Sequence, residues 1–439
     1  MYNTEKDRIR KMKNLLYSGL LLTATLTAAC SSEDNTETES QKGMTLYATV
    51  AETRASMTMG GVDGNWSFAF TANDKINVNN DAVNTYYTFT NNGTNFTSSD
   101  AKTTSEPASW YAYFPGNEVS LANQTGDFSN VANYYALSGS TSATTTGIEG
   151  LSINLKPQVA VLRIVKTNDR DKCDINVKIG DNWVSSLTAK TNEVGFNVTT
   201  STSKVSLLNK NGDAAGTYYY VAVPAGVKIA VYNGDTKRVA TKANGLTAGK
   251  YYTVTTSDVK GTAEATIRST TGVTTKNIGW VQLWAGGPKF ATENVKQKMK
   301  WEDAVKTDDN YVWGNNWRTP TKEEMSVFVP NAGVYGTGYE EQNKKSACTA
   351  TYKSKDGVYG VEFTGNQPGY TKATLFLPTD SKDANYAEFH YFTSSKANNS
   401  NGSSLAFMCS GGFIVVHPYD NNNNTATYFV RPVLADELQ

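Results

Sequence analysis

Apolar and polar residues alternate with a period of two in a series of short runs in this chain. The first clear run spans residues 44–51, where every second side chain would face the same side of a strand. Turns rich in Asn, Gly and Asp separate the runs. Further runs before residue 115 are 66–70, 75–78, 86–89 and 109–114. Only two or three short stretches have helical spacing, so we expect a mainly β protein with many short antiparallel strands.

Charge and histidine content exclude several classes of function. The 439 residues include 41 basic and 41 acidic side chains, so the net charge is zero. No basic stripe follows a helical face, which argues against nucleic acid as a partner. His390 and His417 are the only histidines, and this makes zinc sites and serine or cysteine triads hard to assemble. We therefore expect no enzyme activity, no metal and no cofactor.

An apolar segment over residues 20–29 ends at Cys30, and an acidic, Ser-rich tract follows at once. The segment is too short to span a bilayer, and two lysines precede it. This layout is typical of a bacterial lipoprotein signal peptide over residues 1–29, with the true start at Met1 or Met12. The alternative is a buried core helix that ends in an ordinary cysteine, but the polar tract would leave such a helix nothing to pack on.

Acylation of Cys30, with palmitate among the chains, would tether the mature protein, since each buried methylene contributes about 0.8 kcal/mol. Residues 30–43 would then form a flexible acidic tether. This tract resembles the acidic export tag of surface lipoproteins of the Bacteroides type. The resemblance implies a surface-exposed lipoprotein whose lipid anchor sits in the cell outer membrane.

Two β-sandwich domains are expected after the tether, over residues 44–157 and 158–257. The regular spacing of short strands indicates the first. The second begins with residues 159–165, a run apolar enough for a strand buried on both faces. It also contains the apolar strand 218–224 and a closing strand within 246–254.

Several motifs in residues 44–257 resemble the fimbrillin-like pilins and related surface lipoproteins of the Bacteroidales. In order, they are Thr53-Arg54, Trp66 with Asn73-Asp74-Lys75-Ile76, Trp110-Tyr111-Ala112-Tyr113-Phe114-Pro115, the strand that ends at Pro224, and Ala248-Gly249-Lys250-Tyr251. The resemblance implies two tandem transthyretin-like sandwiches. It also implies strand exchange with other pilin subunits, in which a protease cuts after an arginine and a neighbour's strand replaces the first strand. Arg54 is the candidate processing residue, and the alternative is a solvated turn residue.

A change of composition marks a third domain over residues 279–439, after a polar linker over 258–278. Five of the eight tryptophans lie near the beginning of this domain. One short helix is expected around Trp301. A second is expected after Thr321, because Thr321 and Glu324 have the spacing of a capping box.

Three motifs of the third domain resemble the major paralogous domain first named in Fibrobacter, whose fold is similar to that of C-type lectins. They are residues 316–324, Leu375-Phe376-Leu377-Pro378 and Val430-Arg431-Pro432-Val433. The resemblance implies an α+β C-type-lectin-like domain. We expect Trp317 in its core and a partly buried Arg431 that bonds a carboxylate or the backbone. Lectins that hold sugar through calcium use motifs that this sequence lacks. The nearest tripeptide, Gln367-Pro368-Gly369, has no carboxylate or amide at its third position, so a calcium site is not expected.

A ligand surface is expected in the polar region between residues 386 and 424. Aromatic rings among amide and hydroxyl groups can stack on sugars or anchor a protein partner. The alternative is an Asn-rich loop set whose tyrosines only complete the core. The candidate ligand-binding residues are Tyr386, His390, Tyr391, His417 and Tyr419.

Besides Cys30, the cysteines are Cys173, Cys348 and Cys409. Cys348 and Cys409 fall in the same C-terminal region, so the sequence allows a disulfide between them but does not establish the distance. Cys173 is expected to be a small buried side chain. No basic neighbour would activate Cys409 as a nucleophile.

These features favour a surface-anchored or pilus-tip adhesin, a fimbrial subunit without enzymatic activity that presents a C-terminal domain to a host glycan or protein. A tip position is favoured because residues 428–433 are expected to close the third domain and leave no donor strand. One alternative is a glycan-binding surface lipoprotein of a nutrient-uptake system, outside any pilus. Another is a hydrolase or modifying enzyme, which would need a convergent catalytic cluster.

Overall fold

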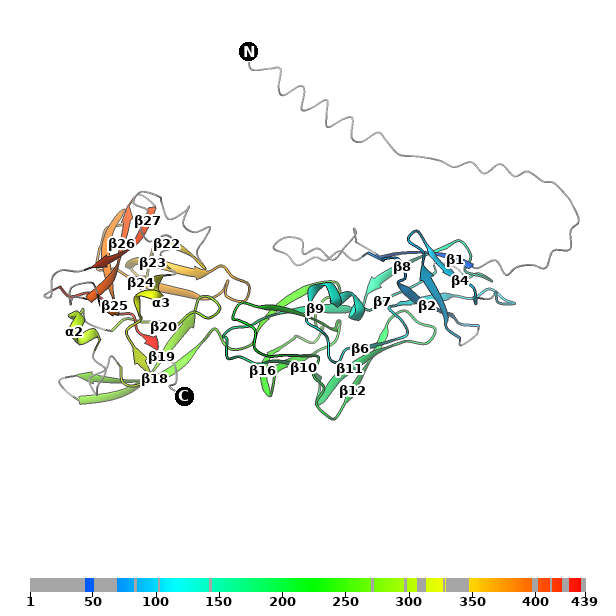
Figure 1. The fold of residues 1–439 in the computed structure, drawn as a ribbon, viewed down its shortest axis with the longest axis horizontal. Helices are drawn as coiled ribbons and strands as arrows, with labels where there is room; N and C mark the ends of the chain where they lie inside the picture. The colour runs from blue at the N-terminus through cyan, green and yellow to red at the C-terminus, as the bar shows by residue number, and fades with distance from the viewer. Residues whose placement is uncertain are drawn as a thin grey trace, which may run out of the picture. The chain divides into compact units, whose positions relative to one another are not determined.

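The computed structural model describes residues 44–50, 69–82, 85–101, 103–141, 144–269, 272–295, 298–305, 313–326, 328, 347–396, 402–410, 413–420 and 426–435. Only the backbone is described at residues 50, 268–269, 326, 402, 410, 413 and 415–420. Cys30 and Arg54 lie outside the described residues. The described chain is mainly β, as the alternation predicted (Figure 1).

Seven strands of the first region, residues 44–157, pair into a closed sheet. Strand β1 (Met44–Val50) closes it, because β1 pairs antiparallel with β4 (Phe96–Ser98) and parallel with β8 (Leu151–Pro157). Between β4 and β8 the order is β3 (Tyr87–Asn91), β2 (Lys75–Asn80), β5 (Trp110–Phe114) and β7 (Leu137–Ser140). A sandwich of two separate sheets was expected here, whereas pairing on both sides of β1 leaves this sheet without an open edge.

Alternate side chains of these strands fill the interior of the closed sheet. Leu46, Phe89, Trp110 and Ile153 are fully buried. The indole N–H of Trp110 donates to the carbonyl of Thr145 at 3.2 Å, so the ring is buried without an unpaired donor. The period-two pattern therefore predicted the inward face of this sheet.

The second region, residues 158–257, contains two sheets. Strand β9 (Val159–Val165) lies between β14 (Tyr218–Pro224) and β17 (Tyr251–Thr255), and nearly all of β9 is buried, as predicted. The other sheet has the order β12 (Phe196–Ser201), β11 (Asn182–Ala189), β10 (Cys173–Ile179), β15 (Ala230–Asn233) and β16 (Thr236–Ala240).

Two short strands extend this second sheet. Strand β13 (Leu208–Lys210) pairs with β10, and β6 (Glu118–Ser120) pairs with β11. Strand β6 comes from the first region, between β5 and β7. A single hydrophobic core also includes buried side chains of both regions. The first and second regions are therefore joined by pairing and by a shared core.

The prediction of a polar linker over residues 258–278 is wrong, because this segment forms most of a β-hairpin. Strands β18 (Lys260–Ser269) and β19 (Gly272–Gln282) pair along its whole length. Its composition is polar because residues 272–277 are exposed on both faces of the strand. The same sheet continues with β20 (Lys289–Ala291), β28 (Val433–Leu434) and β21 (Trp317–Arg318).

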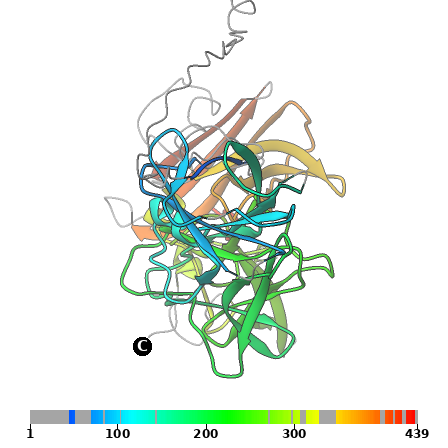
Figure 2. The same ribbon diagram turned by 90° about the vertical axis from the view of Figure 1, so that its right-hand side faces the viewer.

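Two antiparallel sheets of three strands complete the third region, residues 258–435. One contains β22 (Cys348–Lys355), β23 (Val358–Gly365) and β24 (Thr374–Pro378). The other contains β25 (Tyr386–Lys396), β26 (Gly402–Ser410) and β27 (Phe413–Asp420), which lie side by side in both views (Figures 1 and 2).

The helices among the described residues are short: η1 (Phe128–Tyr134), α2 (Trp301–Ala304) and α3 (Lys322–Ser326). The capping box predicted at the start of α3 is confirmed, because Glu324 and Thr321 bond each other's backbone N–H groups. Trp317 is fully buried, as expected. Each helix that the structure describes is too short or too polar to pass through a bilayer.

Candidate functional site

Strand β1 is held in the closed sheet mainly by its backbone. Three register pairs join it to β4 and five join it to β8. The carbonyl of Thr45 also accepts the N–H of Gly150 at 2.8 Å. Among the described side chains of β1, Leu46 alone is fully buried, whereas Tyr47 is 45% exposed.

Loss of β1 would open a groove between β4 and β8. Both edges of that groove would carry unpaired N–H and C=O groups, and the space left by Leu46 would form a pocket on its floor. An extended strand from another chain can fill such a groove by main-chain pairing, with alternate side chains setting the register. Arg54 follows β1 by four residues but lies outside the described residues, so its cleavage stays a prediction.

The segment 426–435 is fixed inside the third region. Strand β28 pairs with both β20 and β21. Arg431 is 1% exposed, and its guanidinium donates to the carbonyls of Ala291 at 2.9 Å and Phe376 at 2.8 Å and to Asn294 Oδ1 at 2.7 Å. Burial lowers the pKa of Arg431. The expected backbone-bonding role is confirmed, but the side chain is completely rather than partly buried.

The register of β25, β26 and β27 brings the two histidines of the chain into one cross-strand row. His390 pairs with Ala406, and Ala406 pairs with His417. Tyr386 lies four residues before His390 in β25, at a position with the same orientation. Tyr419 pairs with Ser404 in β26. The side chains of His417 and Tyr419 are outside the described set.

Tyr391, one of the five candidate ligand residues, is instead a core residue. Its side chain is fully buried, and its hydroxyl accepts a hydrogen bond from Asn294 at 2.7 Å and donates to the carbonyl of Pro378 at 2.9 Å. Burial raises the pKa of Tyr391 to about 12. Tyr391 faces the core because consecutive residues of a strand point to opposite sides, and its neighbour His390 faces the other side of β25.

The imidazole of His390 lies close to Tyr428, Ser404 and Glu388. Its ring stacks on Tyr428, with centroids 4.5 Å apart and planes 15° apart. Its Nδ1 lies 3.5 Å from Ser404 Oγ, and its Nε2 lies 3.7 Å from Glu388 Oε1. Sequence reasoning missed Glu388, although its position two residues before His390 in an alternating strand was a usable signal. It also missed Tyr428, a contact from a distant segment.

We define the recognition face as the side chains of Tyr386, Glu388, His390 and Met408. Tyr386 is 47% exposed and Met408 is 36% exposed. The hydroxyl of Tyr386 donates to Glu388 Oε2 at 3.3 Å. This face combines flat rings, a carboxylate and an apolar side chain, which suits the binding of a polar ligand with an apolar surface.

The structure contains no disulfide between Cys348 and Cys409, so the bond that the sequence allowed is not formed. The two residues lie in different sheets, since Cys348 pairs with Gly365 whereas Cys409 lies between Ala387 and Ile414. Burial raises the pKa of Cys409 to about 12. Cys173 is buried, as expected.

The Gln367-Pro368-Gly369 turn packs against other parts of the protein. Gln367 Oε1 accepts the N–H of Ala285 at 3.1 Å. Gly369 has a φ of +87°, and a Cβ there would lie 2.7 Å from Thr255 Cγ2. Within the part of the chain that the structure describes, no three His, Cys, Asp or Glu side chains are grouped to hold a metal ion.

No family model matches the chain, and no curated protein matches it. Among solved structures, a candidate cell adhesion protein from Bacteroides ovatus has a TM-score of 0.30 and 13% identity, over 54% of this chain and 96% of its own. A candidate cell adhesion protein from Bacteroides uniformis has a TM-score of 0.26 and 12% identity, over 55% and 98%. A fimbrial protein from Bacteroides ovatus has a TM-score of 0.22 and 12% identity, over 90% and 100%. Because these TM-scores are low, the similarity carries no weight for the function of this chain.

Proposed function

We propose that this chain is a surface-anchored fimbrial subunit that acts as an adhesin and has no enzyme activity. The position of β1 carries the proposal. This strand completes a closed sheet through main-chain pairing on both sides, buries Leu46 fully and packs Met44 and Ala48 partly against the core. A cut after Arg54 would separate β1 from the chain that follows, and the strand of another subunit would then occupy the groove between β4 and β8.

The third region is proposed to be the C-type-lectin-like domain, with the recognition face as its ligand-binding surface. The exposure of Tyr386 and the stacking of His390 on Tyr428 support this assignment. The first two regions would be transthyretin-like stalk and assembly modules. Lipids on Cys30 would anchor the chain in the outer membrane, and the ligand would be a host glycan or protein. Residues 426–435 are held inside the third region, so this segment is not available as a donor strand.

The assembly step is tested with a trypsin-like protease and purified fimbrial shaft subunits. N-terminal sequencing should find a new end at Ala55, and a complex that resists SDS should form only after the cut. Arg54→Ala should abolish both results. Arg170→Ala changes an exposed arginine of the second region and should leave both unchanged. A complex that forms without any cut, or a fimbria whose subunit retains residues 44–50, would contradict strand exchange.

A peptide assay tests the groove itself. The cut chain should bind a synthetic peptide of residues 44–50, and the same peptide with Leu46→Asp should bind at least about tenfold more weakly, because a carboxylate would replace the buried side chain. Equal binding of the two peptides would show that the groove is not the binding site. Glycan binding by a chain that never joins a fimbria would instead support the nutrient-uptake alternative.

A further inference from the structure

One face of the sheet β14-β9-β17 carries an arginine between two tyrosine rings. Arg163 in β9 pairs with Tyr220 on one side and Thr253 on the other. The Cζ atom of Arg163 lies 4.8 Å from the ring centre of Tyr251 and 5.8 Å from that of Tyr218. The Oγ1 atom of Thr253 accepts hydrogen bonds from Nε at 3.2 Å and Nη2 at 3.0 Å. The guanidinium is thus fixed by both rings and by one hydroxyl.

The outer edge of this guanidinium remains open. The hydroxyl of Thr253 takes the Nε side of the fork, which leaves both N–H groups of Nη1 and one of Nη2 without an acceptor among the described residues. No carboxylate oxygen of a described residue lies within 4.0 Å of Arg163, whereas Arg238 pairs with Asp258 and Arg318 pairs with Glu324. The open Nη1–Nη2 edge has the geometry that a carboxylate occupies with two parallel hydrogen bonds.

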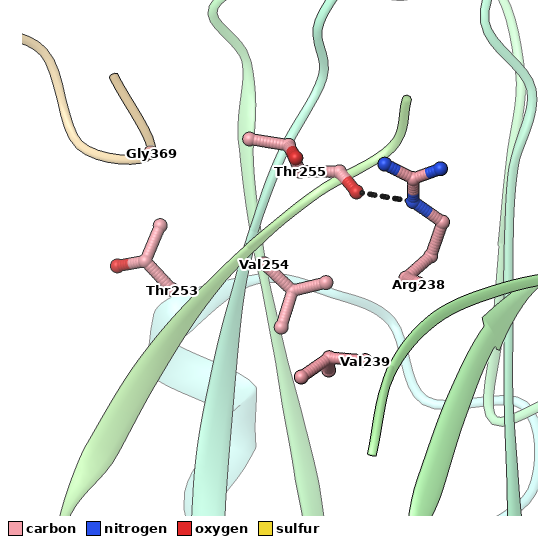
Figure 3. A pocket seen from close by; sticks show the side chains of 6 residues that line it. All are labelled: Arg238, Val239, Thr253, Val254, Thr255 and Gly369. Atoms are coloured by element: carbon pink, nitrogen blue, oxygen red, sulfur yellow. Dashed lines mark hydrogen bonds between the residues drawn. The ribbon is translucent and has the colours of Figure 1, made fainter. Parts of the chain in front are cut away.

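A small groove runs beside β17, the strand that contains Thr253. It has a volume of about 160 Å³ and is lined by Arg238, Val239, Thr253, Val254, Thr255 and Gly369 (Figure 3). Thr253 belongs both to the groove and to the Arg163 site. The Nε of Arg238 donates to the carbonyl of Thr255 at 3.1 Å, which fixes the opposite wall. Pockets for whole small ligands measure about 300–1,000 Å³, so this groove suits one ring rather than an extended chain.

We propose that Arg163, with Tyr218, Tyr251 and Thr253, binds the carboxylate of an acidic sugar, with the sugar ring at the groove beside Thr253. Tyr218 is 38% exposed and offers a ring for stacking, and the threonine hydroxyls offer partners for sugar hydroxyls. The tyrosine rings reduce the contact of the guanidinium with water, which strengthens its attraction for an anion. Arg163 and its three partners lie in the second region, and Gly369 of the third region lines the groove. The site is apart from the recognition face and the β1 groove and does not depend on the proposed function.

A matched pair of sugars tests the site on the full chain. Methyl glucuronide and methyl glucoside differ only at C6, which is a carboxylate in the glucuronide and a hydroxymethyl group in the glucoside. NMR titration measures their affinities. The glucuronide should bind at least about tenfold more tightly, and this difference should shrink as salt is added. Arg163→Gln should weaken glucuronide binding about tenfold or more, and Arg163→Lys should recover only part of it, because lysine lacks the planar fork. Arg170→Gln removes an exposed positive charge from the same region and should leave binding unchanged.

Thr253→Val is a second variant, which keeps the side-chain shape but removes the hydroxyl that positions Arg163. It should also weaken glucuronide binding while the folded protein keeps its circular dichroism spectrum. Equal affinity for the two sugars, no binding of either, or full affinity in Arg163→Gln would overturn the proposal. A short glutamate peptide forms another arm of the experiment. If the peptide binds and the glucuronide does not, the assignment to a sugar is overturned.

Discussion

Thr321 and Glu324 bond each other across the first turn of α3. The N–H of Glu324 donates to Thr321 Oγ1 at 3.2 Å, and the N–H of Thr321 donates to Glu324 Oε2 at 2.7 Å. The same carboxylate accepts two hydrogen bonds from Arg318, at 2.7 and 2.5 Å. Burial disfavours the charged form of Glu324, but the bonds from Arg318 and Thr321 outweigh it and lower the pKa of Glu324. The side chain of Glu324 therefore connects the start of α3 to Arg318 in β21.

The first prediction is that Glu324→Gln reduces the acid sensitivity of the third region. Because the pKa of Glu324 is lower in the folded state, the unfolded state binds more protons as the pH falls. The stabilisation is therefore complete above the unfolded pKa of about 4.3 and is lost as the pH drops below it. Urea unfolding followed by tryptophan fluorescence should show a smaller loss between about pH 5 and pH 3 in the variant. An unchanged pH dependence would argue against this role of Glu324.

The second prediction concerns Arg431. Arg431→Met should destabilise the third region by about 3 kcal/mol, because one buried acceptor, Ala291, and two partly buried acceptors, Asn294 and Phe376, lose their donor. Each such loss in a buried site costs about 1–3 kcal/mol. Arg170→Met removes an exposed arginine and should change stability by less than about 0.5 kcal/mol. Chemical unfolding of both variants measures the difference. A small effect at Arg431 would mean that water replaces the lost bonds.

The third prediction compares neighbouring residues of β1. Leu46→Ala should destabilise the closed sheet by about 2–5 kcal/mol because it leaves a cavity. Tyr47→Ala, on the exposed side, should cost less than about 0.5 kcal/mol. Hydrogen exchange at the amides of β4 and β8 reports the stability of this sheet. Faster exchange in both variants alike would be inconsistent with the alternation of buried and exposed side chains in β1.

The fourth prediction concerns the thiols. Burial raises the pKa values of Cys173 and Cys409 to about 12, so both are protonated at neutral pH and are shielded from reagents. In a Cys30→Ser variant, a thiol reagent should react slowly with the native protein and rapidly after denaturation. Mass spectrometry of the denatured, non-reduced protein should find Cys348 and Cys409 both labelled. Failure of both to take the label would show that they form a disulfide.

Local patterns in the sequence predicted the elements whose signals are local. The apolar run of β9 and the capping box at Thr321 need only neighbouring residues to be recognised. The hairpin β18–β19 was missed because its polar side chains face water, so its composition resembles that of a linker. Tyr391 was assigned to the ligand surface because tyrosines were grouped by closeness in sequence, without applying the alternation of the strand.

Contacts between distant segments could not be predicted from a single sequence. Arg163 is separated from Tyr218, Tyr251 and Thr253 by 55 or more residues, and only the pairing of β14 and β17 with β9 brings them together. The same holds for His390 and Tyr428, which stack across two segments. The spacing of residues along the chain gives no sign of either cluster.

The pairing of β6 with β11 has a mechanical consequence. Residues 118–120 leave the first region to complete a sheet of the second, so a fragment that begins at residue 158 would lack this strand and expose an edge of β11. Such a fragment should aggregate through that edge. When the intact chain is pulled from its two ends, the bonds between β6 and β11 would oppose separation of the regions, and the load would be shared between them.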